Sequence, residues 1–131
     1  MSLSMNTQNP LTKPLSLPTR NKWTHRAIAE YLGASRNTVA IYAVTIAPVV
    51  RDYLAECPRD AKGGVKSGFS LSQYQFWVVC KLITFARLLK ADLNGASYRN
   101  DLKQTVAKGQ HHLSRAAWLY ELEMADDDAA A

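Results

Sequence analysis

Arg36 and Asn37 are the side chains of this sequence whose types are best suited to selective recognition. A guanidinium can donate a pair of hydrogen bonds to guanine O6 and N7, and a carboxamide can pair with adenine N6 and N7. Ala40 and Ile41 follow one turn later, where apolar side chains can rest against thymine methyl groups. This spacing places the four side chains on one face of a short helix, which predicts a helix that enters the major groove of double-stranded DNA.

Two short helices joined by a tight turn are predicted to present that face. Thr24 and Ser35 precede the two helical segments, and their hydroxyl groups can accept hydrogen bonds from the first free backbone N–H groups. Trp23 and Ile28 flank the first cap with the spacing of a hydrophobic staple. Between the segments, Gly33 stands where a residue with positive φ ends a helix without strain.

The string Ile-Ala-Glu-Tyr-Leu-Gly-Ala-Ser-Arg-Asn-Thr-Val, residues 28–39, resembles the helix-turn-helix of DNA-binding regulators in its spacing of Ala, Gly and Val. The resemblance implies that the second helix reads bases while neighbouring polar groups hold phosphates. The expected DNA-contacting residues beside the four base readers are Thr24, Arg26, Ser35 and Thr38. An ordinary helical hairpin in a protein core is the alternative interpretation.

Residues 58–68 read Pro-Arg-Asp-Ala-Lys-Gly-Gly-Val-Lys-Ser-Gly, and the three glycines predict a turn or a hairpin. Residues 23–93 resemble the winged-helix domain of MerR-type regulators and excisionase-like proteins in the order of their predicted elements. These are a two-helix unit, a connection, a basic glycine-rich loop and a capped helix. The resemblance implies that the loop is a small β wing. Lys62 and Lys66 are then expected to clamp the DNA backbone.

Positive charge is concentrated in the first half of the chain. The 131 residues include 16 Lys and Arg and 11 Asp and Glu, a net charge of +5. Residues 1–68 hold nine basic and four acidic residues, whereas residues 69–131 hold seven of each. The excess therefore lies with the predicted reading unit, where phosphates would be met, although many proteins with this charge bind no nucleic acid.

Two long helices are predicted in the C-terminal half. From Phe69 to Leu93 apolar residues cover most of the helical circumference, which is typical of a buried helix, and Ser70 with Gln73 matches a capping box. A second apolar stripe, at steps of three and four residues, predicts one continuous helix over residues 97–124. Its members are Tyr98, Leu102, Val106, Gly109, Leu113, Ala116, Tyr120 and Met124. The MerR-type resemblance implies that this helix joins two copies of the chain.

The predicted fold is therefore all-α or mainly α, a helix-turn-helix with a possible small β wing followed by two long C-terminal helices. The predicted organisation is an extended or disordered arm at 1–22, a winged helix-turn-helix domain at 23–93, a dimerisation helix at 94–125 and an acidic tail at 126–131.

The sequence predicts no catalytic residue, metal site, cofactor or small-molecule ligand. His111 and His112 are adjacent, so on a helix they point about 100° apart and cannot chelate a metal together. The stretch 62–67 lacks the spacing of a phosphate-binding loop. Cys57 and Cys80 show no Cys-x-x-Cys spacing, which favours reduced thiols, and no apolar run is long enough to span a membrane.

These features together predict a sequence-specific DNA-binding protein that is not an enzyme. The expected form is a small homodimeric transcriptional regulator, cytoplasmic and associated with the nucleoid. Two alternatives stay open: an accessory to plasmid or phage DNA processing, such as an excisionase or partition adaptor, and a protein-interaction module built on a helix-turn-helix scaffold.

Overall fold

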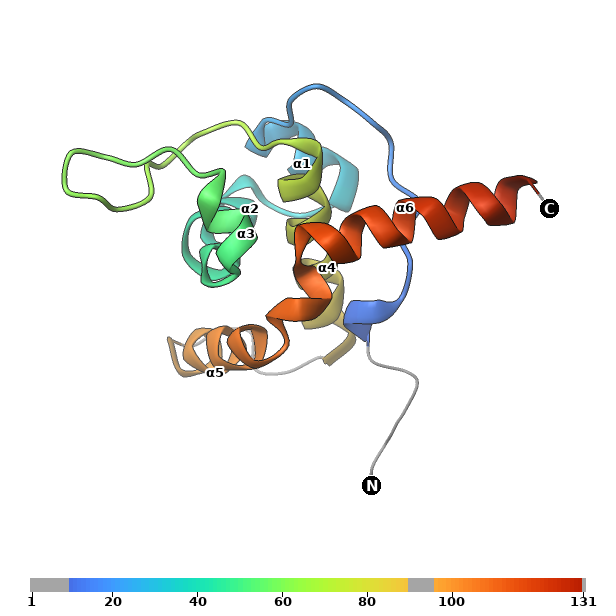
Figure 1. The fold of residues 1–131 in the computed structure, drawn as a ribbon. Coiled ribbons are helices and arrows are strands. Elements are labelled where there is room, and N and C mark those ends of the chain that lie inside the picture. The colour runs from blue at the N-terminus through green and yellow to red at the C-terminus, as the bar shows by residue number, and fades with distance from the viewer. Residues whose placement is uncertain (1–9, 90–95, 131) are drawn as a thin grey trace.

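The computed structural model describes residues 10–89 and 96–130, and over these residues the chain is mainly helical (Figure 1). This confirms the predicted fold class at its coarsest level. No strand occurs in those two ranges; extended backbone is paired only at isolated antiparallel bridges, Trp23 with Leu71 and Arg59 with Val65.

The first two helices, α1 (His25–Leu32) and α2 (Arg36–Ile41), begin after the predicted caps, and α1 ends before the predicted Gly33. Thr24 and Ser35 each accept a hydrogen bond from the backbone N–H three residues later, at 3.0 Å. Gly33 closes α1 in the left-handed conformation with φ of 64°. These short-range interactions define the two helices and the turn between them.

Gly33→Ala is expected to lower the free energy of unfolding by about 1 kcal/mol, because a residue with a Cβ is strained at positive φ. A Cβ at this position would meet no atom within 4 Å, so the loss is purely conformational. Urea denaturation measures it, with Gly33→Asn as the matched control, since asparagine tolerates the left-handed region better than alanine. Equal stability of the alanine variant and the wild type would contradict the left-handed end of α1.

Beyond α2 the chain stays helical through η3 (Tyr42–Ile46), a π-helical turn, and η4 (Ala47–Val49), a 3-10 turn. The short helix α3 (Arg51–Ala55) follows. The buried Tyr53 donates its hydroxyl hydrogen to the backbone oxygen of Ala43 at 2.7 Å. That bond ties α3 to the π turn.

The longest core helix is α4 (Gln73–Leu89), buried over nearly its whole circumference as predicted. The predicted capping box of Ser70 and Gln73 is wrong by two residues. Ser72 accepts from the backbone N–H of Gln75 at 3.2 Å, and the Gln75 side chain accepts from the Ser72 N–H at 3.1 Å. The helix begins where Gln75 can turn inward, because its amide also donates to the Tyr53 carbonyl. The predicted end at Leu93 lies outside the described residues.

The single helix predicted over residues 97–124 is wrong. The chain forms α5 (Ala96–Lys108), the 3-10 turn η5 (Gln110–Leu113) and α6 (Arg115–Ala130). The predicted stripe divides at this break: Leu113 is buried, whereas Tyr120 is largely exposed. Glycine at position 109 weakens the helix there, and the turn allows Leu113 to enter the core.

The C-terminal helix α6 leads away from the body of the molecule (Figure 1). Its backbone is helical through Ala130, so the acidic tail predicted at residues 126–131 continues α6 as far as residue 130. Residue 131 lies outside the described residues.

The segment before α1, for which an extended or disordered arm was predicted at residues 1–22, packs on the body from residue 10 onward. Its 3-10 turn η2 (Pro10–Thr12) buries Leu11, and the chain then runs without helix toward Trp23. Gln73 donates to the carbonyl of Pro18 at 2.8 Å, and its side-chain oxygen accepts from the Arg20 N–H at 3.0 Å. Residues 1–9 lie outside the described residues.

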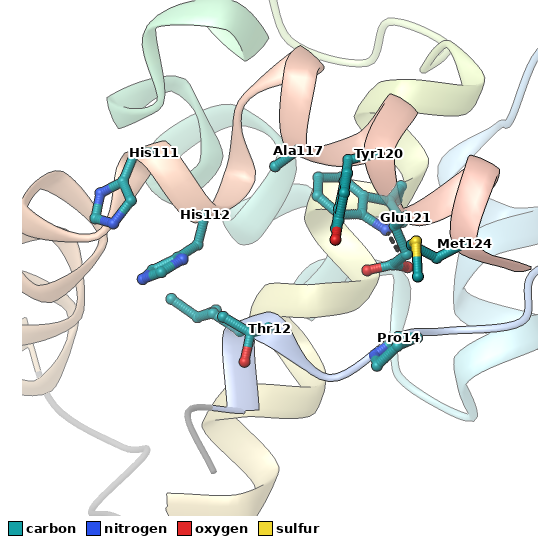
Figure 2. A pocket seen from close by; sticks show the side chains of 10 residues that line it. Thr12, Pro14, His111, His112, Ala117, Tyr120, Glu121 and Met124 are labelled. Atoms are coloured by element: carbon teal, nitrogen blue, oxygen red, sulfur yellow. Dashed lines mark hydrogen bonds between the residues drawn. The ribbon is translucent and has the colours of Figure 1, made fainter. Parts of the chain in front are cut away.

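A buried ion pair joins α6, α4 and this N-terminal segment. Lys81 Nζ lies 2.7 Å from Glu121 Oε1, and it also donates to the backbone oxygens of Leu11 and Lys13. The second carboxylate oxygen of Glu121 accepts from the Trp77 indole N–H at 2.9 Å. Glu121 therefore reaches from α6 back toward the body of the protein (Figure 2).

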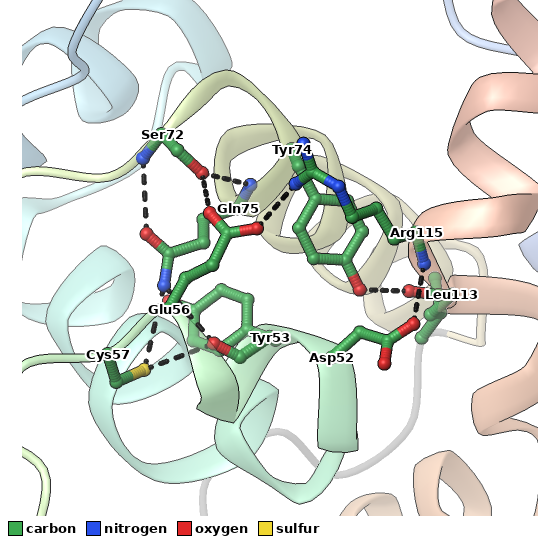
Figure 3. Close-up of polar contacts among 9 residues, drawn as sticks. All are labelled: Asp52, Tyr53, Glu56, Cys57, Ser72, Tyr74, Gln75, Leu113 and Arg115. Atoms are coloured by element: carbon green, nitrogen blue, oxygen red, sulfur yellow. Dashed lines mark hydrogen bonds and ion pairs between the residues drawn. The ribbon is translucent and has the colours of Figure 1, made fainter.

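The start of α6 is held by a second polar cluster, which links it to α3 and α4 (Figure 3). Arg115 pairs with Glu56 at 2.6 Å, and its backbone N–H donates to Asp52 at 2.9 Å. The Tyr74 hydroxyl donates to the Leu113 carbonyl at 2.6 Å. The C-terminal end of the 110–114 turn is thus anchored by residues more than 35 positions earlier in the chain, which explains why periodicity did not reveal the turn.

Cys57 and Cys80 are free and buried, as expected for reduced thiols. Burial raises the pKa of Cys57 to about 11 and that of Cys80 to about 12.

Iodoacetamide at pH 8 is therefore expected to alkylate the native protein about 100-fold more slowly than the urea-unfolded chain, since each pKa unit changes the thiolate fraction tenfold. Because unfolded thiols ionise near pH 9, the free energy of unfolding contributed by these groups should fall as the pH rises above that value. Equal native and unfolded alkylation rates would contradict the burial of both thiols.

Candidate nucleic-acid interface

The beginning of α2 presents Arg36 and Asn37 to solvent. Both side chains are exposed, and neither makes a hydrogen bond or ion pair within the described part of the chain. Ser35 anchors them, because its hydroxyl caps the helix and lies 2.9 Å from the hydroxyl of the half-buried Thr38. A rigid backbone carrying two free planar side chains can place paired hydrogen-bonding groups against a base edge.

The apolar residues that follow Arg36 and Asn37 on α2 are less exposed than predicted. Ala40 is half-buried, and Ile41 and Val44 are half-buried and pack against the core. Ile41, which was expected on the outer face of the helix, therefore lies partly against the core. The helix continues into η3 at this point, so these side chains lie at a junction of helical segments and not on the free end of an isolated helix.

Near the start of α1, Thr24 is exposed and uses its hydroxyl oxygen as the cap, which leaves the hydroxyl hydrogen available to a phosphate. Arg26 lies 3.6 Å from Glu30, with 75% and 70% of the two side chains exposed. Such a pair contributes about 0–1 kcal/mol, so a phosphate can replace the carboxylate at little loss.

The basic glycine-rich loop is a closed hairpin that extends away from the helices (Figure 1). Lys66 N–H donates to the Pro58 carbonyl at 2.9 Å, and Asp60 N–H donates to the Gly64 carbonyl at 2.8 Å. The Asp60 carboxylate accepts from the N–H groups of residues 62 and 64, both at 2.9 Å. The segment is thus a hydrogen-bonded hairpin with one bridge, between Arg59 and Val65, and the described residues form no strands where the resemblance implied a small β wing.

Lys62 and Lys66 are exposed on this hairpin, as the prediction requires. Arg59 donates to the Gly63 carbonyl at 2.7 Å, so one basic side chain shapes the loop while the two lysines carry free charge. A hairpin with a hydrogen-bonded backbone and exposed ammonium groups suits contact with DNA phosphates of any sequence.

The base of the hairpin is connected to the beginning of α1. Trp23 and Leu71 exchange backbone hydrogen bonds of 2.8 and 2.7 Å. The rings of His25 and Phe69 lie 6.2 Å apart in an edge-on arrangement. Burial lowers the pKa of His25, which favours its neutral form. The chain that follows the hairpin is therefore joined directly to the start of α1, where Thr24 lies.

Sequence reasoning missed Arg87. This exposed residue near the end of α4 donates to the carbonyl of Gly33 at 3.3 Å and so adds a positive charge beside the turn between α1 and α2. Its position 54 residues further along the chain left no signal in the local pattern.

Within the described ranges, no group of three or more His, Cys, Asp or Glu residues could hold a metal ion. The helices described there include none with both the length and the apolar character needed to cross a membrane.

The geometry defines a mainly helical protein that carries a capped two-helix unit beside a basic hairpin. Compared with known protein families, curated proteins and solved structures, the chain matches none of them.

Proposed function

We propose that this chain is a sequence-specific DNA-binding protein whose α1–α2 unit acts as a helix-turn-helix. The observation that carries the proposal is the pair of free side chains, Arg36 and Asn37, at the capped start of α2. These two types together read guanine and adenine edges, and they follow a tight turn that leaves them accessible. Ala40 lies on the same side and supplies an apolar contact.

Phosphate contacts are assigned to the surroundings of this reading helix. Thr24, Ser35 and Arg26 contribute from the helix starts, and Lys62 and Lys66 contribute from the hairpin. These contacts orient the protein on DNA and make its affinity depend on salt, but they carry no sequence information.

The proposed functional unit is a homodimer that regulates transcription. Four large apolar side chains on α6 are exposed, and this helix leads away from the body (Figure 1). They are Leu119, Tyr120, Leu122 and Met124. Burying them against a second copy would remove apolar surface from water and place two reading helices on one duplex.

Arg36→Ala is expected to weaken binding to the selected DNA site by about 1–3 kcal/mol and to relax the preference at one base pair. The site is first obtained by selection from random duplex DNA, and the variant is then titrated on the selected site and on single-base variants of it. Arg99→Ala serves as the matched control, since this exposed arginine lies on α5 outside the proposed interface.

A second arm of the same experiment tests the hairpin. Lys66→Ala should weaken selected and random DNA alike and reduce the salt slope by about one unit. If Arg36→Ala also lowers selected and random binding equally, base reading by this residue is excluded. If no DNA sequence is enriched, the result favours the alternative function, a protein-interaction module built on a helix-turn-helix scaffold. The genes adjacent to the enriched sites separate a transcriptional regulator from a DNA-processing accessory.

A further inference from the structure

A hollow of about 280 Å³ lies where the N-terminal segment meets η5 and α6. Figure 2 shows Tyr120 and Met124 on α6 facing Thr12 and Pro14 across it, with His112 on one side. The buried indole of Trp77 also lines it. The walls come from separate stretches of chain, so the space is bounded on several sides and suits a compact molecule more than an extended one.

The lining combines aromatic surface with a small number of polar groups. Trp77 and Tyr120 supply rings, while Ala117 leaves room between α6 and the rest of the wall. An apolar space with few polar groups is the usual composition of small-molecule sites. Flat ligands gain most there, since aromatic rings attract one another in stacked or edge-on arrangements.

The charged groups beside the hollow neutralise each other. The Glu121 carboxylate is paired with Lys81 at 2.7 Å and also accepts from the Trp77 indole N–H. Burial lowers the pKa of His112, and the nearby His111 and Lys81 lower it further, so the neutral imidazole is favoured. A neutral imidazole offers one hydrogen-bond donor and one acceptor. Among the described side chains that line the hollow, the one carboxylate, that of Glu121, is already paired with Lys81.

We propose that this hollow binds an uncharged aromatic molecule of one or two rings that carries a hydrogen-bonding group at its edge. The volume agrees with this size, because engineered cavities of about 150 Å³ already accept benzene. In the bound state the rings lie beside Trp77 and Tyr120, and the polar edge faces His112. None of the groups assigned to DNA lines the hollow, but Tyr120 and Met124 also belong to the surface proposed to join two copies, so a bound ligand and a second copy are expected to compete for it.

Indole is the probe that tests the proposal, as an uncharged two-ring molecule with one N–H donor. The full-length protein is titrated with it while the methyl signal of Met124 is followed by NMR. Saturable shifts are expected for the wild type. Ala117→Leu, which fills the hollow, should weaken binding about tenfold or more, which corresponds to about 1.4 kcal/mol. The matched control is Ala116→Leu, because this neighbouring residue on α6 is exposed and does not line the hollow.

Two further arms keep the result decisive. Indole-3-acetate, the charged analogue, should bind more weakly than indole, because burying its carboxylate is unfavourable. Tyr120→Ala, a change at a largely exposed position, should weaken indole binding even if Ala117→Leu fails to fold. The proposal is overturned if the wild type shows no saturable shift or if the two leucine variants bind alike. It is also overturned if the Met124 signal moves with protein concentration and indole does not compete, since a second copy then occupies the hollow.

Discussion

Glu121→Ala is expected to lower the free energy of unfolding by about 3 kcal/mol or more, because it removes the partner of a buried charge. Only 1% of the Lys81 side chain and 13% of the Glu121 side chain are exposed. The remaining acceptors, the backbone oxygens of Leu11 and Lys13, carry no full charge and cannot replace the carboxylate. Urea denaturation at pH 7 measures the loss.

A double variant that removes both charges separates the net contribution of the ion pair from the penalty of leaving Lys81 without its partner. Lys81→Met combined with Glu121→Leu removes both charges and keeps apolar volume, so the double variant should lie within about 1–2 kcal/mol of the wild type. If the double variant is as unstable as Glu121→Ala alone, packing of the aliphatic parts, and not the uncompensated charge, explains the loss.

The deficit of Glu121→Ala should shrink as the pH rises from 7 toward 10. Burial lowers the pKa of Lys81, and Glu121 opposes that shift, so removing Glu121 lowers the folded-state pKa further. Above that pKa the folded variant holds a neutral amine while the unfolded chain still binds the proton. Stability then rises with pH, because the unfolded state binds more protons. If the stability difference between Glu121→Ala and the wild type stays constant over this pH range, the unpaired Lys81 ammonium is not the cause of the loss.

Trp23→Ala is expected to lower the free energy of unfolding by about 3–5 kcal/mol, which is typical when a buried tryptophan leaves a cavity. The indole is 1% exposed and stacks on Phe76 with ring centroids 3.6 Å apart. Its N–H also donates to the side chain of Gln73 at 2.8 Å, and its backbone pairs with Leu71. Thermal and urea denaturation monitored by far-UV circular dichroism measure the effect.

Trp118→Ala is the matched control, since this tryptophan on α6 is only half-buried. Its loss should be less than half that of Trp23→Ala, because less apolar surface returns to water. Comparable losses at the two positions would contradict the central place of Trp23. A large loss at Trp23 would also show that the start of α1 depends on the core, since the same residue holds the backbone bridge beside Thr24.

The local features of the two-helix unit were predictable from the sequence. Thr24, Ser35 and Gly33 act on backbone groups within five residues, so residue type and spacing suffice to place them. The burial of α4 was also predictable, because an apolar circumference has no other stable location in water. The stacking of Trp23 on Phe76 joins positions 53 residues apart and left no local trace in the sequence.

Only the tertiary structure decided the features that depend on distant partners. Lys81 lies in an apolar run, and nothing near it in the chain indicates that Glu121, 40 residues later, supplies its counter-charge. The break between α5 and α6 depends on hydrogen bonds to Tyr74 and Asp52, which lie far earlier in the chain. The helical spacing of apolar residues continues across the break, so nothing in that spacing indicated it. The half-burial of Ile41 likewise follows from packing around η3. Periodicity records which face of a segment is apolar, whereas the partner that covers the face is chosen by the fold as a whole.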